Sequence, residues 1–434
     1  MRLGSLLRHD LVQNIVALYG VQAAAYVFPL ITVPYLARVL GPEGWGKVAM
    51  AQAFGQYLAI VVEYGFGLSA TREVARARDS LERRAELLAG VMGAKALLAL
   101  PAVGLAWLAS RRIAAFRDDP LVLWAGVFWA LASAFNLMWY FQGLERMRFV
   151  AALDVGARAG AVAAIFLWVR APEDGWKVLI LTGTACVFSM SLALNVAYRE
   201  VPFRLPTLRE VWNALRTGWN MFVFRGAVSL YTVGNTFILG LFAVPQVVGY
   251  YAGAEKISRA LVGFLGPVSQ ALYPRLSHLV GESRAEAARL ARLGLGVMGL
   301  VGLALGLSAF ALAPWLVRVL LGPDYAPAVP ALRILALLPF LVALSNVLGI
   351  QWMLPLGLER PFNTIILVAG ILNLSLAVLL APPLAQVGMA CAVVAAEASV
   401  TGSMYLYLRM RALNPAALGR VGRIPVPHER RSAS

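Results

Sequence analysis

The sequence is poor in charged residues: Asp, Glu, Lys and Arg make up 14% of its 434 residues, whereas hydrophobic residues make up 60%. A soluble domain carries about a quarter charged residues, so this composition excludes a soluble globular body and is typical of a chain solvated by lipid. Lipid cannot hydrogen-bond exposed backbone groups, and long apolar stretches in it must therefore be helices. We expect an all-α integral membrane protein.

Cysteine and histidine are also scarce. Cys186 and Cys391 both lie inside apolar segments, and the three histidines, His9, His278 and His428, are scattered over loops and tails. Two buried cysteines are too few for a disulfide framework or a zinc site. We predict no metal site.

Enzyme motifs are missing as well. The sequence has no phosphate-binding glycine loop with a lysine, and no catalytic acidic pair in a sizeable exposed domain. We predict that the chain does not hydrolyse ATP, has no catalytic residues and binds no cofactor. Transport is the function class that remains.

Twelve apolar stretches are each near the roughly 20 residues that a helix needs to cross a bilayer. The predicted spans are residues 11–40, 45–70, 87–109, 121–141, 149–169, 176–197, 219–242, 247–276, 293–315, 329–354, 362–380 and 384–408.

Basic residues outnumber acidic ones by 38 to 22, which gives a net charge of +16. They lie in short loops between apolar stretches, which indicates membrane topology and contact with anionic lipid rather than a nucleic-acid partner. With both termini in the cytoplasm, 24 of the 38 basic residues lie on that side and 8 on the other. This bias predicts that both ends are cytoplasmic.

The longest predicted cytoplasmic connection, residues 199–216, falls near the middle of the chain. It predicts two lobes of six helices, residues 1–198 and 218–411, joined by residues 199–217. Residues 412–434 are basic and lack an apolar period, so we expect a disordered tail. A shift of 203 residues aligns Pro42 with Pro245 and Gly46 with Gly249, which suggests a parallel internal repeat.

Polar residues recur at helical spacing inside three predicted spans. The shift of 203 residues pairs polar positions of the first half with charged positions of the second: Gln22 with Arg225, Gln52 with Glu255, and Gln56 with Arg259. Tyr251 and Lys256 lie beside this second set. We interpret these residues as the lining of a central cavity whose cationic patch lies mainly on the C-terminal lobe.

Several charged residues within spans allow two interpretations. Glu255 and Arg259 are one helical turn apart and could neutralise each other. Asp154 and Arg158 have the same spacing, which favours a structural pair. Glu63 and Glu397 have no partner at i±3 or i±4, so they are candidates for ion coupling as well as for bonds to another helix.

Four segments resemble the signature of bacterial O-antigen and polysaccharide flippases, in the multidrug, oligosaccharidyl-lipid and polysaccharide exporter superfamily. They are LITVPYLARVLGPEGWG at residues 30–46, YGFGLSATREVARAR at residues 64–78, VGYYAGAEKISRALVGFLGPVSQALYPRLS at residues 248–277 and LLGPDYA at residues 320–326.

The resemblance implies two six-helix lobes around a V-shaped cavity that opens to either side in turn. It implies an undecaprenyl-pyrophosphate-linked oligosaccharide as substrate, moved to the periplasmic leaflet of the bacterial inner membrane for O-antigen or exopolysaccharide assembly. In that interpretation Arg225, Lys256 and Arg259 meet the pyrophosphate, while Gln22, Gln52, Gln56 and Tyr251 meet sugar. Membrane lipid, a polysaccharide polymerase and chain-length machinery are the expected partners.

Two alternatives remain open. A cation-coupled multidrug exporter of the same superfamily predicts a carboxylate near the first helix, where this sequence has Gln13, Asn14 and Gln22. A structural scaffold of a glycan-assembly complex would not need charged stripes in a cavity. Glycosyltransferase and polymerase genes beside its own would favour the flippase.

Reporter fusions test the predicted topology. Fusions at Ser80, Thr207, Ser283 and Ala417 should report the cytoplasm, and fusions at Asp119 and Asp174 the periplasm, because of the basic bias. Two or more reversed signals would contradict the twelve-helix topology.

Overall fold

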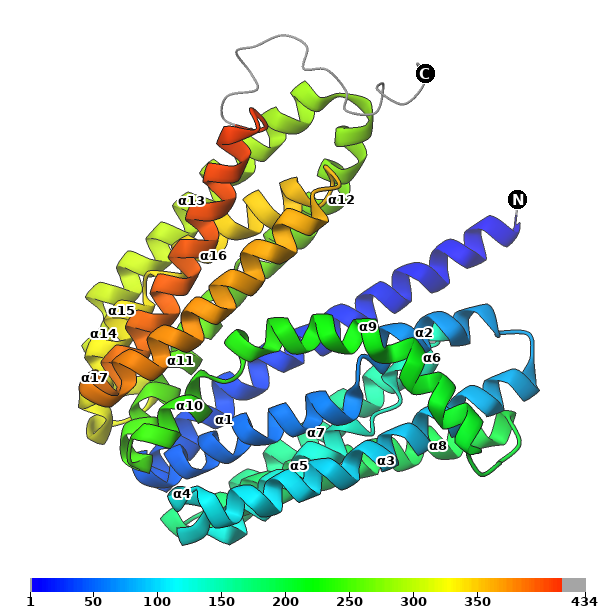
Figure 1. Cartoon of the computed structure of the whole chain (residues 1–434), viewed down its shortest axis with the longest axis horizontal. Helices are drawn as coiled ribbons and strands as arrows, with labels where there is room; N and C mark the ends of the chain where they lie inside the picture. Colours follow the sequence, from blue (N-terminus) through cyan, green and yellow to red (C-terminus); the bar gives the residue numbers. More distant parts are fainter. Residues whose placement is uncertain (1, 416–434) are drawn as a thin grey trace. The chain divides into compact units, whose positions relative to one another are not determined.

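The computed structural model describes residues 2–415, and within them it leaves out the side chains of residues 2–26, 220, 224, 225, 227–232 and 271. Helices account for nearly all of the described chain, and strands are absent from it (Figure 1). The expected all-α class is therefore confirmed. Most of the tail expected at residues 412–434 lies outside the described residues.

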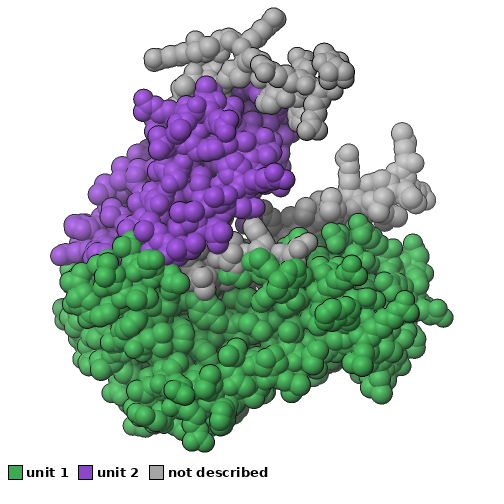
Figure 2. Space-filling model, in the orientation of Figure 1, with its two compact units in different colours: residues 1–256, 314–331, 374–390 green, residues 257–313, 332–373, 391–434 purple. Residues whose placement is uncertain are grey.

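Two compact units divide the chain (Figure 2). Unit 1 contains residues 1–256, 314–331 and 374–390, and unit 2 contains residues 257–313, 332–373 and 391–434. The lobe boundaries at residues 198 and 218 stay a prediction.

Unit 1 is built largely from the helices of the first half of the chain. They are α1 (Arg2–Glu63), α2 (Phe66–Arg76), α3 (Leu81–Arg112), α4 (Ala114–Asp118), α5 (Pro120–Ala134), α6 (Met138–Gly143), α7 (Met147–Trp168), η1 (Pro172–Asp174), α8 (Gly175–Glu200), α9 (Leu208–Thr232) and α10 (Asn235–Phe242). The helix α11 (Pro245–Gly263) begins in unit 1, and the short elements α14 (Ala313–Leu320) and η2 (Pro323–Ala328) fall mostly or wholly within it.

Unit 2 contains most of the remaining helices. They are α12 (Gly266–Glu282), α13 (Arg284–Ala311), α16 (Leu338–Ser345), the π-helical η3 (Asn346–Met353), and most of α15 (Val329–Leu335) and of α17 (Glu359–Met410). Helix α13 packs along α16, and Gly302 makes this possible because a side chain there would meet the Pro339 carbonyl. Small residues allow such close backbone approach within membranes.

Seven helical stretches of the described residues are long and apolar enough to cross a membrane. Helix α1 contains the first expected span and most of the second, which continues into α2, and α17 contains the last two; α1 and α17 each have one non-helical residue inside them. The total of twelve spans stays a prediction.

The break in α1 lies at Gly41, whose φ of 65° and ψ of 177° form a combination that is essentially restricted to glycine. Pro42 follows at the first position of the second helical segment, where a missing N–H costs nothing. The Gly-Pro step in the first flippase-like segment therefore ends one helix and starts the next.

Helices α1 and α11 cross at the two glycines that the repeat pairs. A side chain on Gly46 would overlap the Pro245 carbonyl, and a side chain on Gly249 would overlap the Pro42 carbonyl. Each helix thus presents the same Pro-x-x-x-Gly step to the other. This reciprocal contact agrees with the alignment by 203 residues.

The crossing predicts the effect of a single methyl group. Gly46→Ala should lower the unfolding temperature of the purified protein, because the new Cβ would collide with the backbone carbonyl of Pro245. Overpacking of this kind costs roughly 1–3 kcal/mol. The matched control is Gly104→Ala in α3, where nothing lies within 4 Å of a new Cβ. That change should be neutral or stabilise by about 1 kcal/mol. Equal unfolding temperatures for both variants would contradict the tight crossing.

Candidate functional site

A stretch of unit 1 long and apolar enough to span a membrane, Pro120–Gly143, is interrupted in its C-terminal third. Helix α5 ends at Ala134 and α6 begins at Met138. The side chain of Asn136 bridges the gap: its Oδ1 accepts from the Met138 N–H at 3.2 Å, and its Nδ2 donates to the Ser133 carbonyl at 2.9 Å. Backbone that leaves a helix at membrane depth is tolerated where it is buried in protein or lines an aqueous cavity.

Lys95 of α3 fills the other side of this break. Its side chain is fully buried, with 0% of its surface exposed. The ammonium Nζ donates to the Ala134 carbonyl at 2.7 Å and to the Asn136 carbonyl at 3.2 Å. The Ala134 carbonyl belongs to the end of α5, where helix carbonyls lack partners and carry partial negative charge, and the Asn136 carbonyl lies in the break just after it. Glu63 of α1 acts on the ammonium electrostatically.

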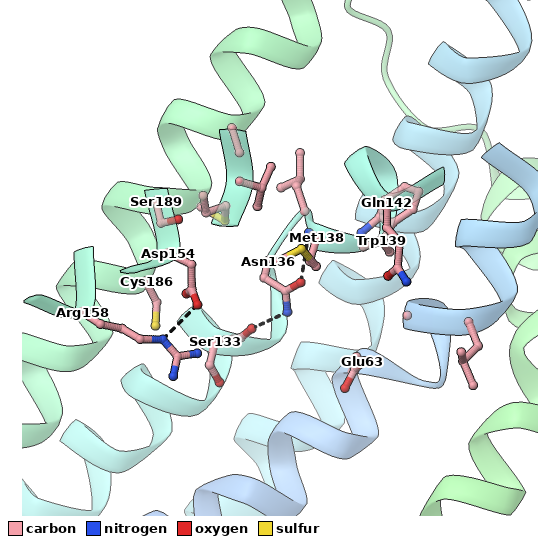
Figure 3. A pocket seen from close by; sticks show the side chains of 16 residues that line it. Glu63, Ser133, Asn136, Met138, Trp139, Gln142, Asp154, Arg158, Cys186 and Ser189 are labelled. Carbon is pink, nitrogen blue, oxygen red and sulfur yellow. Dashed lines mark hydrogen bonds and ion pairs between the residues drawn. The ribbon is translucent and has the colours of Figure 1, made fainter. Parts of the chain in front are cut away.

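A cavity of about 460 Å³ adjoins the break. Its walls come from seven regions of unit 1: α1, α2, α5, the α5–α6 break, α6, α7 and α8. The polar and sulfur-containing side chains that line it include Glu63, Ser133, Asn136, Gln142, Asp154, Arg158, Cys186 and Ser189. In Figure 3, Asp154, Arg158 and Cys186 lie on one side of Asn136, and Glu63 lies on the other.

The pairing predicted for Asp154 and Arg158 is confirmed, with Nε and Oδ2 2.9 Å apart. What the sequence did not reveal is that this pair faces the same cavity as Glu63. The available signal was the accumulation of Lys95, Asp154 and Arg158 in neighbouring spans, since charges at this depth usually face a bundle interior or a water-filled space.

The basic residues after the second flippase-like segment hold helix ends together. The Arg84 guanidinium is 6% exposed; it donates to Glu200 at 2.6 Å and to the Tyr140 hydroxyl at 3.0 Å. Arg146 donates to the same Glu200 carboxylate. One acidic residue at the end of α8 thus ties α3 and the start of α7.

A second tie joins the end of α2 to the α6–α7 connection. Arg78 donates to the Gly143 carbonyl at 2.9 Å and to the Glu145 carboxylate at 2.7 Å. The Arg78 guanidinium holds the pKa of Glu145 below its ordinary value. Glu145 has a positive φ of 59°, which is uncommon for a residue with a side chain, so the tie fixes a strained turn.

The polar stripe predicted on the eighth span lies on α11. Tyr251 is fully buried, and Glu255 is half-buried with its Oε2 accepting from the Thr236 hydroxyl of α10 at 2.9 Å. Lys256 and Arg259 are both exposed. The acid of the stripe is therefore bonded to a neighbouring helix, and the two cations are accessible to solvent or ligand.

The remaining candidates are distributed as follows. On α1, Gln52 is half-buried and Gln56 is exposed. The side chains of Gln22 and Arg225 lie outside the described residues. Glu397 of α17 is half-buried in unit 2, where the Ser345 hydroxyl donates to its carboxylate at 2.6 Å.

Metal-ligating side chains do not gather in the part of the chain that the structure describes: it contains no group of three or more His, Cys, Asp and Glu residues placed to hold a metal ion.

Comparison with known proteins gives a consistent result. The family model described as "Polysaccharide biosynthesis protein" matches residues 11–280. Two curated proteins named "Putative O-antigen transporter" are similar over most of their length. The one from Escherichia coli (strain K12) is 32% identical over 92% of this chain and 96% of its own. The one from Shigella dysenteriae is 30% identical over 83% of this chain and 91% of its own.

Solved structures share the fold at much lower identity. The lipid II flippase MurJ in an inward closed conformation superposes with a TM-score of 0.70 at 12% identity, over 94% of this chain and 90% of that chain. An inward-facing multidrug resistance MATE family transporter of the MOP superfamily gives 0.64 at 16% identity, over 94% and 100%. These likenesses establish the fold alone.

Proposed function

The chain belongs to the polysaccharide biosynthesis protein family, as its four sequence segments predicted, and on this basis we propose that it moves a polyprenyl-pyrophosphate-linked oligosaccharide from the cytoplasmic to the periplasmic leaflet. It is a multi-pass membrane transporter. The direction of transport, the bacterial inner membrane as its location and cytoplasmic termini belong to the proposal. A polysaccharide polymerase and chain-length machinery are proposed partners on the same basis.

The main structural support for the proposal is that α11 has two exposed cations, Lys256 and Arg259. The curated relatives of the chain are named O-antigen transporters. A pyrophosphate carries negative charge that hydrocarbon cannot solvate, so it needs cationic partners along its path. Arginine binds phosphate oxygens in a bidentate manner and lysine binds them as a point charge. Lys256 and Arg259 supply one of each, four residues or fewer from Glu255, whose carboxylate Thr236 holds.

Sugar-binding roles follow for the uncharged residues. Amide and hydroxyl groups can donate to and accept from sugar hydroxyls, which suits Gln22, Gln52, Gln56 and Tyr251. Arg225 joins the cationic group in this proposal by its sequence position in the repeat. The polyprenyl tail would stay in lipid, because moving an apolar chain through a polar path gains nothing.

Alternating access is the proposed mechanism. It requires helices that stay in contact while a cavity opens on one side or the other, and the reciprocal crossing of Gly46 and Gly249 is suited to such a contact. Small residues at such a crossing let the two backbones approach closely, so few side chains lie between them.

Substitution of Arg259 and Lys256, with surface polysaccharide as the readout, tests the proposed role of the α11 cations. Arg259→Ala should lower surface polysaccharide by roughly tenfold or more in cells that lack another flippase, since a hydrogen bond to a charged group is worth about 1.5–3 kcal/mol. Arg259→Lys should retain part of the activity if charge alone matters, and little if bidentate contact matters. Lys256→Ala should act in the same direction.

The matched control is Arg111→Ala, which removes an exposed arginine that stacks on Trp107 at the end of α3. It should leave export unchanged at equal protein abundance. Wild-type export by the Arg259→Ala and Lys256→Ala variants would contradict the proposed role. Sensitivity to cationic dyes with normal surface glycan would support the multidrug alternative instead.

Energy coupling is proposed to involve Glu63 or Glu397, and the contacts favour Glu397. The buried Lys95 ammonium and the Glu63 carboxylate attract each other across helices, so Glu63 serves as a counter-charge to a lysine. The recorded side-chain partner of Glu397 is the neutral hydroxyl of Ser345. A carboxyl whose partner is neutral can gain and lose a proton without leaving the positive charge of a buried lysine uncompensated.

If export is proton-coupled, Glu397→Gln should reduce it by roughly tenfold and make the remainder insensitive to an uncoupler. Glu255→Gln is the comparison variant, expected to affect folding or substrate affinity while the response to the uncoupler persists. Surface polysaccharide is measured with and without uncoupler at matched protein levels. Full uncoupler sensitivity of the Glu397→Gln variant would exclude this residue as the proton carrier.

A further inference from the structure

The break between α5 and α6 offers oxygen atoms of the kind that bind alkali cations. The carbonyls of Ala134 and Asn136 lie at the C-terminal end of a half-helix, and the Glu63 carboxylate lies close enough to act on the same charge. In transporters, unwound carbonyls and half-helix C-termini are the groups that coordinate sodium. The end of a helix also adds partial negative charge.

In this chain, a cation already lies between these oxygens. The Lys95 ammonium donates to both carbonyls, and its side chain is completely buried. Burying an ammonium is costly unless it is paired and hydrogen-bonded. A helix end could have been satisfied by a neutral side chain at lower cost. The positive charge itself is therefore the notable feature.

We propose that the Lys95 ammonium occupies a monovalent-cation site of the N-terminal half as a built-in cation, and that shortening this side chain opens the site to sodium. The cavity beside the break provides the access route, because Glu63 and Asn136 belong both to the cavity wall and to the surroundings of the ammonium. At about 460 Å³ it can admit a hydrated ion.

A consequence for transport follows, and it rests on the proposed function: export by the wild-type chain should not draw on a sodium gradient through this site. The binding of sodium to a purified variant does not depend on flipping. Failure of the flippase proposal and failure of this inference are therefore distinguishable.

Thermal unfolding of the purified full-length protein tests the inference. It is measured in detergent with sodium chloride or choline chloride at equal concentration. The wild type should unfold at the same temperature in both salts. Lys95→Ala should unfold at a lower temperature in choline and regain stability in sodium, in a saturable manner, by about 3 °C when sodium is about a hundredfold above its dissociation constant.

Two control variants isolate the site. Lys95→Met keeps an unbranched side chain over the carbonyls without a charge, so it should be destabilised and should not respond to sodium. Lys47→Ala removes a lysine that pairs with Glu43 and Asp119 in a partly exposed position, and it should also show no sodium effect.

An equal sodium response in the wild type, or in Lys95→Met, would place the sodium effect elsewhere and overturn the inference. A Lys95→Ala variant that sodium does not stabilise would show that Lys95 only caps the helix end. If Lys95→Ala yields no folded protein in either salt, Lys95→Ser decides, because its short polar side chain also leaves the two carbonyls open to sodium. Sodium should then raise its unfolding temperature, and the absence of a rise would overturn the inference.

Discussion

A buried ammonium needs oxygen atoms around it, and the interrupted stretch between α5 and α6 needs a donor for its carbonyls. Lys95 and the residues around Asn136 satisfy both needs at once. The same requirement, that polar groups find partners away from water, explains the Asn136 bridges and the Ser345–Glu397 hydrogen bond. The cavity in unit 1 adjoins the point at which this helix is interrupted.

The sequence predicted the features that depend on residue type and local spacing. Hydrophobic composition predicted the all-helical class, and the motif segments predicted the family. The Asp154–Arg158 pair followed from one helical turn of separation. The repeat predicted which glycines correspond, although it gave no reason to expect that Gly46 and Gly249 touch.

Contacts between distant residues were beyond such reasoning. Lys95 meets a carbonyl 39 residues away, and a backbone oxygen leaves no trace in the sequence that identifies it as a partner. Arg84 was counted as one basic residue among many in the topology, yet it is nearly buried and bonded to Glu200 and Tyr140. The number of basic residues in a loop indicates which side of the membrane the loop faces. It does not distinguish a solvated arginine from one that hydrogen-bonds two helices to each other.

The crossing of α1 and α11 has the form of an isologous interface, the self-complementary patch by which two identical subunits meet across a twofold axis. Here both patches belong to one chain, so each position can diverge without changing its counterpart. The repeat alignment pairs Gln52 with Glu255 and Gln56 with Arg259, so the second repeat carries charges where the first is neutral. Independent divergence of the two repeats permits this difference. A true homodimer would have to carry every charge twice, and two like cations across an axis would repel; a single chain can place its cations on one side only.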